Sequence, residues 1–211
     1  MEYVVKPKLF ALVIVAFLVG SSQLASAQKG EVSVNYSLLD YNPAKSLSGS
    51  RDLHGGGGSI GLNLGEYFAL KGEFEGYTST TLTYHVPSTP NSAPGTFNTQ
   101  ANMFTYLFGP QLNISKHRSR WFGETLFGAA YTNAYANLFK AAGVTGLSAT
   151  NNGFAMSIGG GVDIPVSKRI ALRPVQFDYF LTRYEWKPLG INNQSNFRYQ
   201  AGVVFAFGHY Y

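Results

Sequence analysis

The sequence predicts an all-β protein: an eight-stranded antiparallel up-and-down transmembrane β-barrel after a cleaved N-terminal signal peptide. Three observations lead to this prediction. Apolar residues recur with a period of two along eight segments, which is the repeat of a strand whose two faces meet different surroundings. The connections between these segments alternate between long and short. Charged residues are only 13% of the chain, about half of their share in soluble domains.

Residues 1–27 have the composition of a secretory signal peptide. Lys6 and Lys8 give a positive start, an apolar run follows over Leu9–Val19, and Ala25-Ser26-Ala27 is a small-x-small cleavage site. The alternative is a membrane anchor helix, but the apolar run is shorter than the roughly 20 residues that a spanning helix needs. We therefore expect cleavage after Ala27 and one mature barrel domain over residues 28–211.

The bulk composition excludes several other classes of protein. The chain has no cysteine, so neither disulfides nor thiolate metal sites are available. The four histidines are far apart and lack metal-ligand spacing, and we expect no metal and no cofactor. The net charge of +5 is scattered, and the densest basic cluster is Lys116-His117-Arg118-Ser119-Arg120. We interpret this cluster as a solvated turn and expect no nucleic-acid partner.

The first four strands are expected where one apolar row alternates with a polar row. The fourth is less regular, because Met103 and Leu107 interrupt its polar row. The four apolar rows are Val32, Val34, Tyr36 and Leu38; Ile60, Leu62 and Leu64; Phe68, Leu70, Gly72 and Phe74; and Phe104, Tyr106, Phe108 and Leu112.

The last four strands follow the same rule with one change of phase. A weak alternation covers Arg120–Tyr131, and a strong one covers Phe154–Ile164 and Phe197–Phe207. Within Arg169–Arg183 the apolar positions are even before Pro174 and odd after it. Proline is tolerated at bulges, and one extra residue restores a single apolar face. The sequence therefore predicts a β-bulge near Pro174.

The connections predict which membrane face each end of the barrel meets. Long polar stretches (residues 40–53, 79–98, 132–152 and 185–195) alternate with short ones (65–67, 113–119 and 165–168). Short turns on the periplasmic side and longer loops outside are the pattern of outer-membrane barrels. The sequence thus places the protein in the bacterial outer membrane, with membrane lipids and lipopolysaccharide as its surroundings.

A soluble barrel with inverted faces has the same alternation, so the composition of each face decides between the two. The polar rows are mainly Ser, Gly, Asn and Ala, which suits the narrow lumen of an eight-stranded barrel. The apolar rows carry the aromatic residues of interfacial girdles, Phe68, Phe74, Tyr179, Tyr184, Trp186, Phe197 and Phe207. We expect a charge network in the lumen, formed by Lys71, Glu73, Glu75, Glu124, Asp163, Arg173, Asp178 and Arg198.

Two parts of the chain carry a family resemblance. The stretch Gly159–Tyr184 (GGGVDIPVSKRIALRPVQFDYFLTRY) has a glycine-rich strand, a short turn and an A-L-R…Y strand, and the chain ends with aromatic residues on one parity. Here it resembles the OmpA-like and related outer-membrane β-barrel family. The resemblance implies a non-enzymatic anchor, a loop-presenting surface or a narrow channel, assembled by the barrel-assembly machinery. Pro174-Val175-Gln176 and His209 depart from the family pattern.

Two motifs suggest other chemistry. Gly56–Gly61 matches G-x-G-x-x-G, but a dinucleotide site needs a strand before the motif and a helix after it. We interpret this run as a flexible loop that enters the second strand. His117, Ser119 and Glu124 have the residue types of a lipid A deacylase, the alternative function, but they fall at a short periplasmic turn. The sequence favours the non-enzymatic barrel and predicts no catalytic residue.

Overall fold

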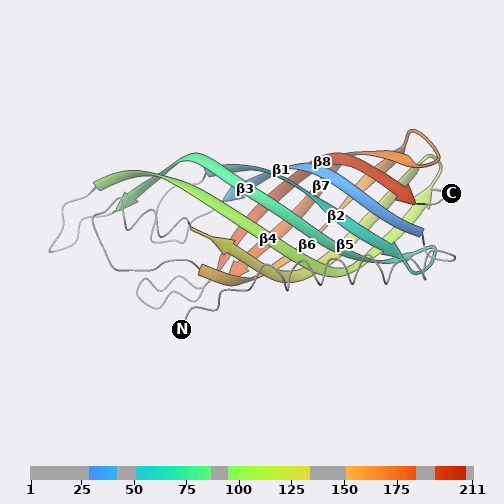
Figure 1. The fold of residues 1–211 in the computed structure, drawn as a ribbon, viewed down its shortest axis with the longest axis horizontal. Coiled ribbons are helices and arrows are strands. Elements are labelled where there is room, and N and C mark those ends of the chain that lie inside the picture. Colours follow the sequence, from blue (N-terminus) through green and yellow to red (C-terminus); the bar gives the residue numbers. More distant parts are fainter. Residues whose placement is uncertain (1–28, 42–50, 87–94, 134–150, 184–192, 208–211) are drawn as a thin grey trace, which may run out of the picture.

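The protein is a closed barrel of eight antiparallel strands. A computed structural model describes residues 29–41, 51–86, 95–133, 151–183 and 193–207. Each strand pairs with the next, and β8 pairs with β1 to close the sheet (Figure 1). Among the described residues no helix is long and apolar enough to span a membrane. The strands are β1 (Lys29–Tyr41), β2 (Arg51–Asn63), β3 (Phe68–Val86), β4 (Gly95–Lys116), β5 (Ser119–Thr132), β6 (Asn151–Pro165), β7 (Ile170–Arg183) and β8 (Gln194–Phe207).

The short turns all lie at one end of the barrel, as the sequence predicts. The start of β1 and the end of β8 meet where Gly30 pairs with Phe207. The three short turns, β2–β3, β4–β5 and β6–β7, lie at this end, because every strand runs antiparallel to its neighbours. The expected signal peptide at 1–27 lies outside the described residues, as do the segments 42–50, 87–94, 134–150 and 184–192 in the long connections.

Alternate side chains point outward from the wall and into the lumen. Outward residues are apolar and exposed over most of the wall, such as Phe104 (58%), Phe177 (64%) and Phe197 (67%). Water-soluble proteins rarely expose a continuous apolar surface of this extent, whereas lipid requires one. The expected girdle residues Phe68, Phe74, Tyr179, Phe197 and Phe207 all point outward, while Tyr184 and Trp186 lie outside the described residues.

The bulge near Pro174 is confirmed. Along β7 and β8 the pairing passes from Arg173 with Gly202 to Gln176 with Gln200, so β7 contains one extra residue. The carbonyl of Pro174 accepts a hydrogen bond of 2.8 Å from the Tyr199 hydroxyl. The bulge allows both Arg173 and Gln176 to point into the lumen, where both are buried.

The prediction of a polar loop over 79–98 is wrong for most of its length. After a register shift, β3 and β4 continue to pair from Leu82 with Thr99 as far as Val86 with Gly95. These two strands project beyond the others at the left of Figure 1. The segment 80–86 (TTLTYHV) is rich in Thr, Val and Tyr, which are enriched in strands. The polar composition of 79–98 was therefore not sufficient evidence for a loop.

Two shorter predictions also need correction. The turn expected over 113–119 contains only His117 and Arg118, because β4 continues to Lys116 and β5 begins at Ser119. His117 has a φ of 56°, the left-handed conformation that tight turns use. The glycine run 55–58 is not a flexible loop but lies within β2. A Cβ on Gly57 would lie 2.0 Å from the carbonyl oxygen of Phe74, so the close approach of the strands requires glycine there.

Candidate functional site

The charged residues of the lumen form the candidate functional site. All eight that the sequence analysis singled out point into the lumen, and none is more than 4% exposed. Period-two alternation brings them there, because each shares the inward row of its strand. They are Lys71, Glu73 and Glu75 on β3, Glu124 on β5, Asp163 on β6, Arg173 and Asp178 on β7, and Arg198 on β8.

The larger group of ion pairs, which we name the central network, joins Lys71, Glu73, Glu124, Asp178 and Arg198. Lys71 Nζ lies 3.0 Å from Glu124 Oε2 and 3.1 Å from Glu73 Oε2. Arg198 Nη1 lies 2.5 Å from Glu73 Oε1, and its Nη2 lies 2.8 Å from Asp178 Oδ2. Inside the bore, the pair of Lys71 with Glu124 reaches past β4, and the pair of Arg198 with Glu73 reaches past β1 and β2.

A second network lies around Asp163. Its Oδ1 accepts a hydrogen bond of 2.7 Å from Arg173 Nε, and its Oδ2 accepts one of 2.6 Å from Arg120 Nη2. Arg120 also pairs with Glu31 across the bore, from β5 to β1. Two cations thus meet two carboxylates in a buried space, where an unpaired charge would be costly.

Sequence reasoning missed Arg120 and Glu31. Arg120 was assigned to the solvated basic turn, but it is 6% exposed and points into the lumen. Its parity was the available signal, since Arg120 and Glu124 are both even positions of one strand. Glu31 begins the polar row of β1 that continues with Ser33, and it is buried in the same way.

Glu75 takes no part in these ion pairs. It accepts hydrogen bonds from the side-chain amides of Asn35 and Gln200, and within the described residues its Oε2 has no hydrogen-bond partner. Gln176 links the central network internally, because its Nε2 donates to Glu124 Oε1 and to Asp178 Oδ2, both at 3.0 Å.

The lumen is less uniformly polar than the sequence analysis predicted from rows of mainly Ser, Gly, Asn and Ala. The Arg173 guanidinium lies over the Phe122 ring, 4.2 Å from its centroid, and that of Arg198 lies 5.5 Å from the Phe180 centroid. Aromatic faces attract such cations. Other apolar side chains share the buried interior, namely Leu39, Leu53, Met103, Leu107 and Leu126.

One small cavity lies beside the charges. A cavity of about 10 Å³ lies among residues that include Glu31, Lys71 and Arg173, which is room for about one water molecule. Glycine makes the tight fit possible, since a Cβ on Gly159 would lie 2.1 Å from Asp178 Oδ1. No cluster of His, Asp and Glu suited to a metal ion occurs among the described residues.

The residues of the possible lipid A deacylase do not form a catalytic group. The Ser119 hydroxyl donates to the carbonyl of Lys116, next to the two-residue turn that contains His117. Glu124 is buried in the lumen, where it binds Lys71 and Gln176. A carboxylate held in that way cannot orient a histidine in an exposed turn.

Comparison with known proteins gives a likeness of fold. No protein-family model matches the chain, and no curated protein sequence matches it. Neisserial surface protein A is 11% identical, with 86% of this chain and 98% of that chain covered and a TM-score of 0.53. For Ail, the attachment invasion locus protein of Yersinia pestis, the identity is 9%, the coverage is 85% and 98%, and the TM-score is 0.49. The N-terminal β-barrel domain of Pseudomonas aeruginosa OprF is 15% identical, with 84% of this chain and 97% of that chain covered and a TM-score of 0.45. The likeness to Neisserial surface protein A, together with the closed sheet of eight strands, shows that the chain has the fold of the small eight-stranded outer-membrane β-barrels.

Proposed function

We propose that this protein is a non-enzymatic barrel of the bacterial outer membrane that presents its β3–β4 hairpin and long connections at the cell surface. Its lumen is closed to solutes of sugar size. The observation that carries the proposal is the set of ion pairs inside the bore between strands that are not neighbours, from Arg198 to Glu73, from Lys71 to Glu124 and from Arg120 to Glu31.

These contacts fill the lumen rather than line a channel. In each of these three pairs the cation bonds a carboxylate on a strand that is not its neighbour, so the two side chains meet inside the bore. An eight-stranded barrel is only just wide enough for its own side chains. Ions could pass only when pairs exchange partners, and any conductance should therefore be small.

The surface role is supported by the length of the β3–β4 hairpin. These strands contain 19 and 22 residues, whereas the other six contain 13 to 15. Residues 79–86 continue β3 past Thr78, the last β3 residue that pairs with β2, by roughly 25 Å along the strand. Recognition is usually placed on loops held by a rigid scaffold, and this hairpin extends such a scaffold at the end opposite the short turns.

Liposome swelling tests the closed lumen. Protein reconstituted in phospholipid vesicles should give no swelling in sucrose beyond that of empty vesicles, and single-channel recordings should show only small steps. A general porin in parallel vesicles is the positive control. Rapid swelling or steady porin-level conductance would mean that the lumen is open, and the protein would then be a porin.

Epitope insertion tests the surface role. One variant carries the epitope between Pro90 and Asn91 in the β3–β4 connection. Its matched control carries the epitope between Val166 and Ser167, in the short β6–β7 turn at the other end. Antibody should label intact cells that express the first variant, and should label the second only after the outer membrane is permeabilised. The reverse pattern would refute the orientation.

A further inference from the structure

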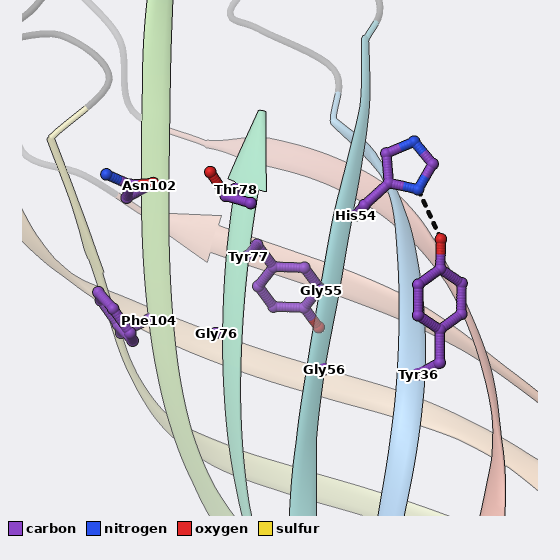
Figure 2. A pocket seen from close by; sticks show the side chains of 9 residues that line it. All are labelled: Tyr36, His54, Gly55, Gly56, Gly76, Tyr77, Thr78, Asn102 and Phe104. Carbon is purple, nitrogen blue, oxygen red and sulfur yellow. Dashed lines mark hydrogen bonds between the residues drawn. The ribbon is translucent and has the colours of Figure 1, made fainter. Parts of the chain in front are cut away.

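The outer wall of the barrel contains a groove that the lumen network does not explain. The groove has a volume of about 480 Å³ and lies over β1 to β4 (Figure 2). One row of paired residues crosses it, from Tyr36 on β1 to Gly56, Gly76 and Phe104 on the next three strands. We name this feature the wall groove.

The row explains why the wall is hollow here. Tyr36 and Phe104 are outward aromatic residues, 49% and 58% exposed, and they form the two sides. Between them Gly56 and Gly76 have no side chains, so the floor is strand backbone. Tyr77 lies beneath the floor and is 2% exposed. Its ring fills the lumen side of the wall, so the groove opens to the outside of the barrel.

The wall groove has a polar rim at one end. His54, Thr78 and Asn102 occupy the next outward row, and their registers join them across β2, β3 and β4. His54 Nδ1 lies 2.6 Å from the Tyr36 hydroxyl, as the dashed line in Figure 2 marks. This is the one hydrogen bond of His54 within the described part of the chain, where its Nε2 has no partner.

The rim faces the outer leaflet in the proposed orientation. From Gly56 to His54, β2 runs toward the long β1–β2 connection and away from the short β2–β3 turn. An apolar trough on the lipid-facing wall, with hydrogen-bonding groups at its outer end, matches an acyl chain whose head lies near the membrane surface. If no molecule occupied the wall groove, the residues that line it would lose the van der Waals contacts that a bound chain provides.

We propose that the wall groove binds one acyl chain of lipopolysaccharide. The chain lies along the glycine floor between Tyr36 and Phe104. Its head meets the rim formed by His54, Thr78 and Asn102. Acyl chains of lipopolysaccharide carry amide and hydroxyl groups close to the sugar, and these donate and accept hydrogen bonds as the rim does. Diacyl phospholipids have only ester acceptors at that depth. The proposal relies on the outer-membrane orientation but not on the closed lumen or the hairpin.

The variant Gly76→Leu tests the wall groove. A Cβ at Gly76 meets only the Phe104 ring within 3.4 Å, and that ring can turn aside. The matched control is Gly72→Leu, an outward glycine of the same strand, where a Cβ lies 3.8 Å from the ring of Phe108. Gly72 does not line the groove. Native mass spectrometry measures the deep-rough lipopolysaccharide retained by each folded barrel in detergent, against retained phosphatidylethanolamine.

We expect Gly76→Leu to weaken lipopolysaccharide retention about tenfold, because the leucine side chain would occupy the glycine floor on which the acyl chain lies. Gly72→Leu should retain it as the unaltered protein does. The variant His54→Leu should reduce the preference for lipopolysaccharide over phosphatidylethanolamine. Equal retention by Gly76→Leu and the unaltered protein would overturn the proposal, and so would equal losses in the two leucine variants. Phosphatidylethanolamine retained as strongly as lipopolysaccharide would overturn the assignment of the lipid. Mobility of unboiled protein on gels confirms that each variant is folded, and none of these results depends on solute passage.

Discussion

Replacing Arg198 with methionine should destabilise the barrel more than any exposed arginine replacement. Arg198 is 1% exposed, and its guanidinium binds Glu73, Asp178 and Ser157. The variant Arg198→Met retains much of the side-chain volume but leaves Asp178 with Gln176 and Glu73 with Lys71. Breaking a buried pair by removing one partner costs about 3–5 kcal/mol. We expect a loss near 3 kcal/mol, because Glu73 keeps a cation and Asp178 does not.

The assay is urea unfolding in phospholipid vesicles, followed by the gel mobility of unboiled samples. The control is Arg183→Met, since Arg183 is exposed on the outer wall of β7 and such surface changes usually cost within about 0.5 kcal/mol. The double variant Arg198→Met with Asp178→Asn should recover most of the loss, because the uncompensated carboxylate is gone. If Arg198→Met and Arg183→Met unfolded at the same urea concentration, the central network would contribute nothing and the reasoning would be refuted.

Three further predictions concern packing, closure and export. Gly159→Ala should prevent stable folding, because its Cβ would lie 2.2 Å from the Phe177 carbonyl oxygen, whereas Gly72→Ala should fold normally; comparable refolding yields would contradict this. Boiled and unboiled protein should migrate differently on gels, since the closed sheet leaves no edge from which to unfold; identical mobility would argue against closure. N-terminal sequencing of the exported protein should begin at Gln28, and a retained N-terminus would favour the membrane anchor.

The strand count and the faces were predictable because alternation is a local property. Positions that face lipid are apolar, and positions that face the narrow lumen are polar or small. The two faces of each strand are therefore visible in its own sequence. The same parity placed Lys71, Glu73 and Glu75 in the lumen, where they lie. The change of phase at Pro174 predicted the bulge, because one added residue exchanges the two faces.

The remaining features depend on contacts between distant strands. Arg120 looked like part of a basic turn, and only Glu31 and Asp163, on β1 and β6, account for its burial. The glycines of β2 resembled a loop in the sequence. The need for glycine comes from β3, where the backbone of Phe74 approaches Gly57 too closely for a side chain. These contacts depend on how the strands are paired in register across the sheet. That pairing cannot be read from the sequence of one strand.

The most direct test of the account asks which face of the wall meets lipid. The chain has two tryptophans, and the variant Trp186→Phe leaves Trp121, which points outward and is 56% exposed. A second variant combines Trp186→Phe, Trp121→Phe and Phe122→Trp, which moves the fluorophore to the adjacent inward position, where Phe122 is 6% exposed. In vesicles of phospholipid brominated near the glycerol end of its acyl chains, the account predicts strong quenching of the first variant and little quenching of the second. Equal quenching of both, or stronger quenching of the second, would contradict the assignment of the two faces and every proposal that depends on it.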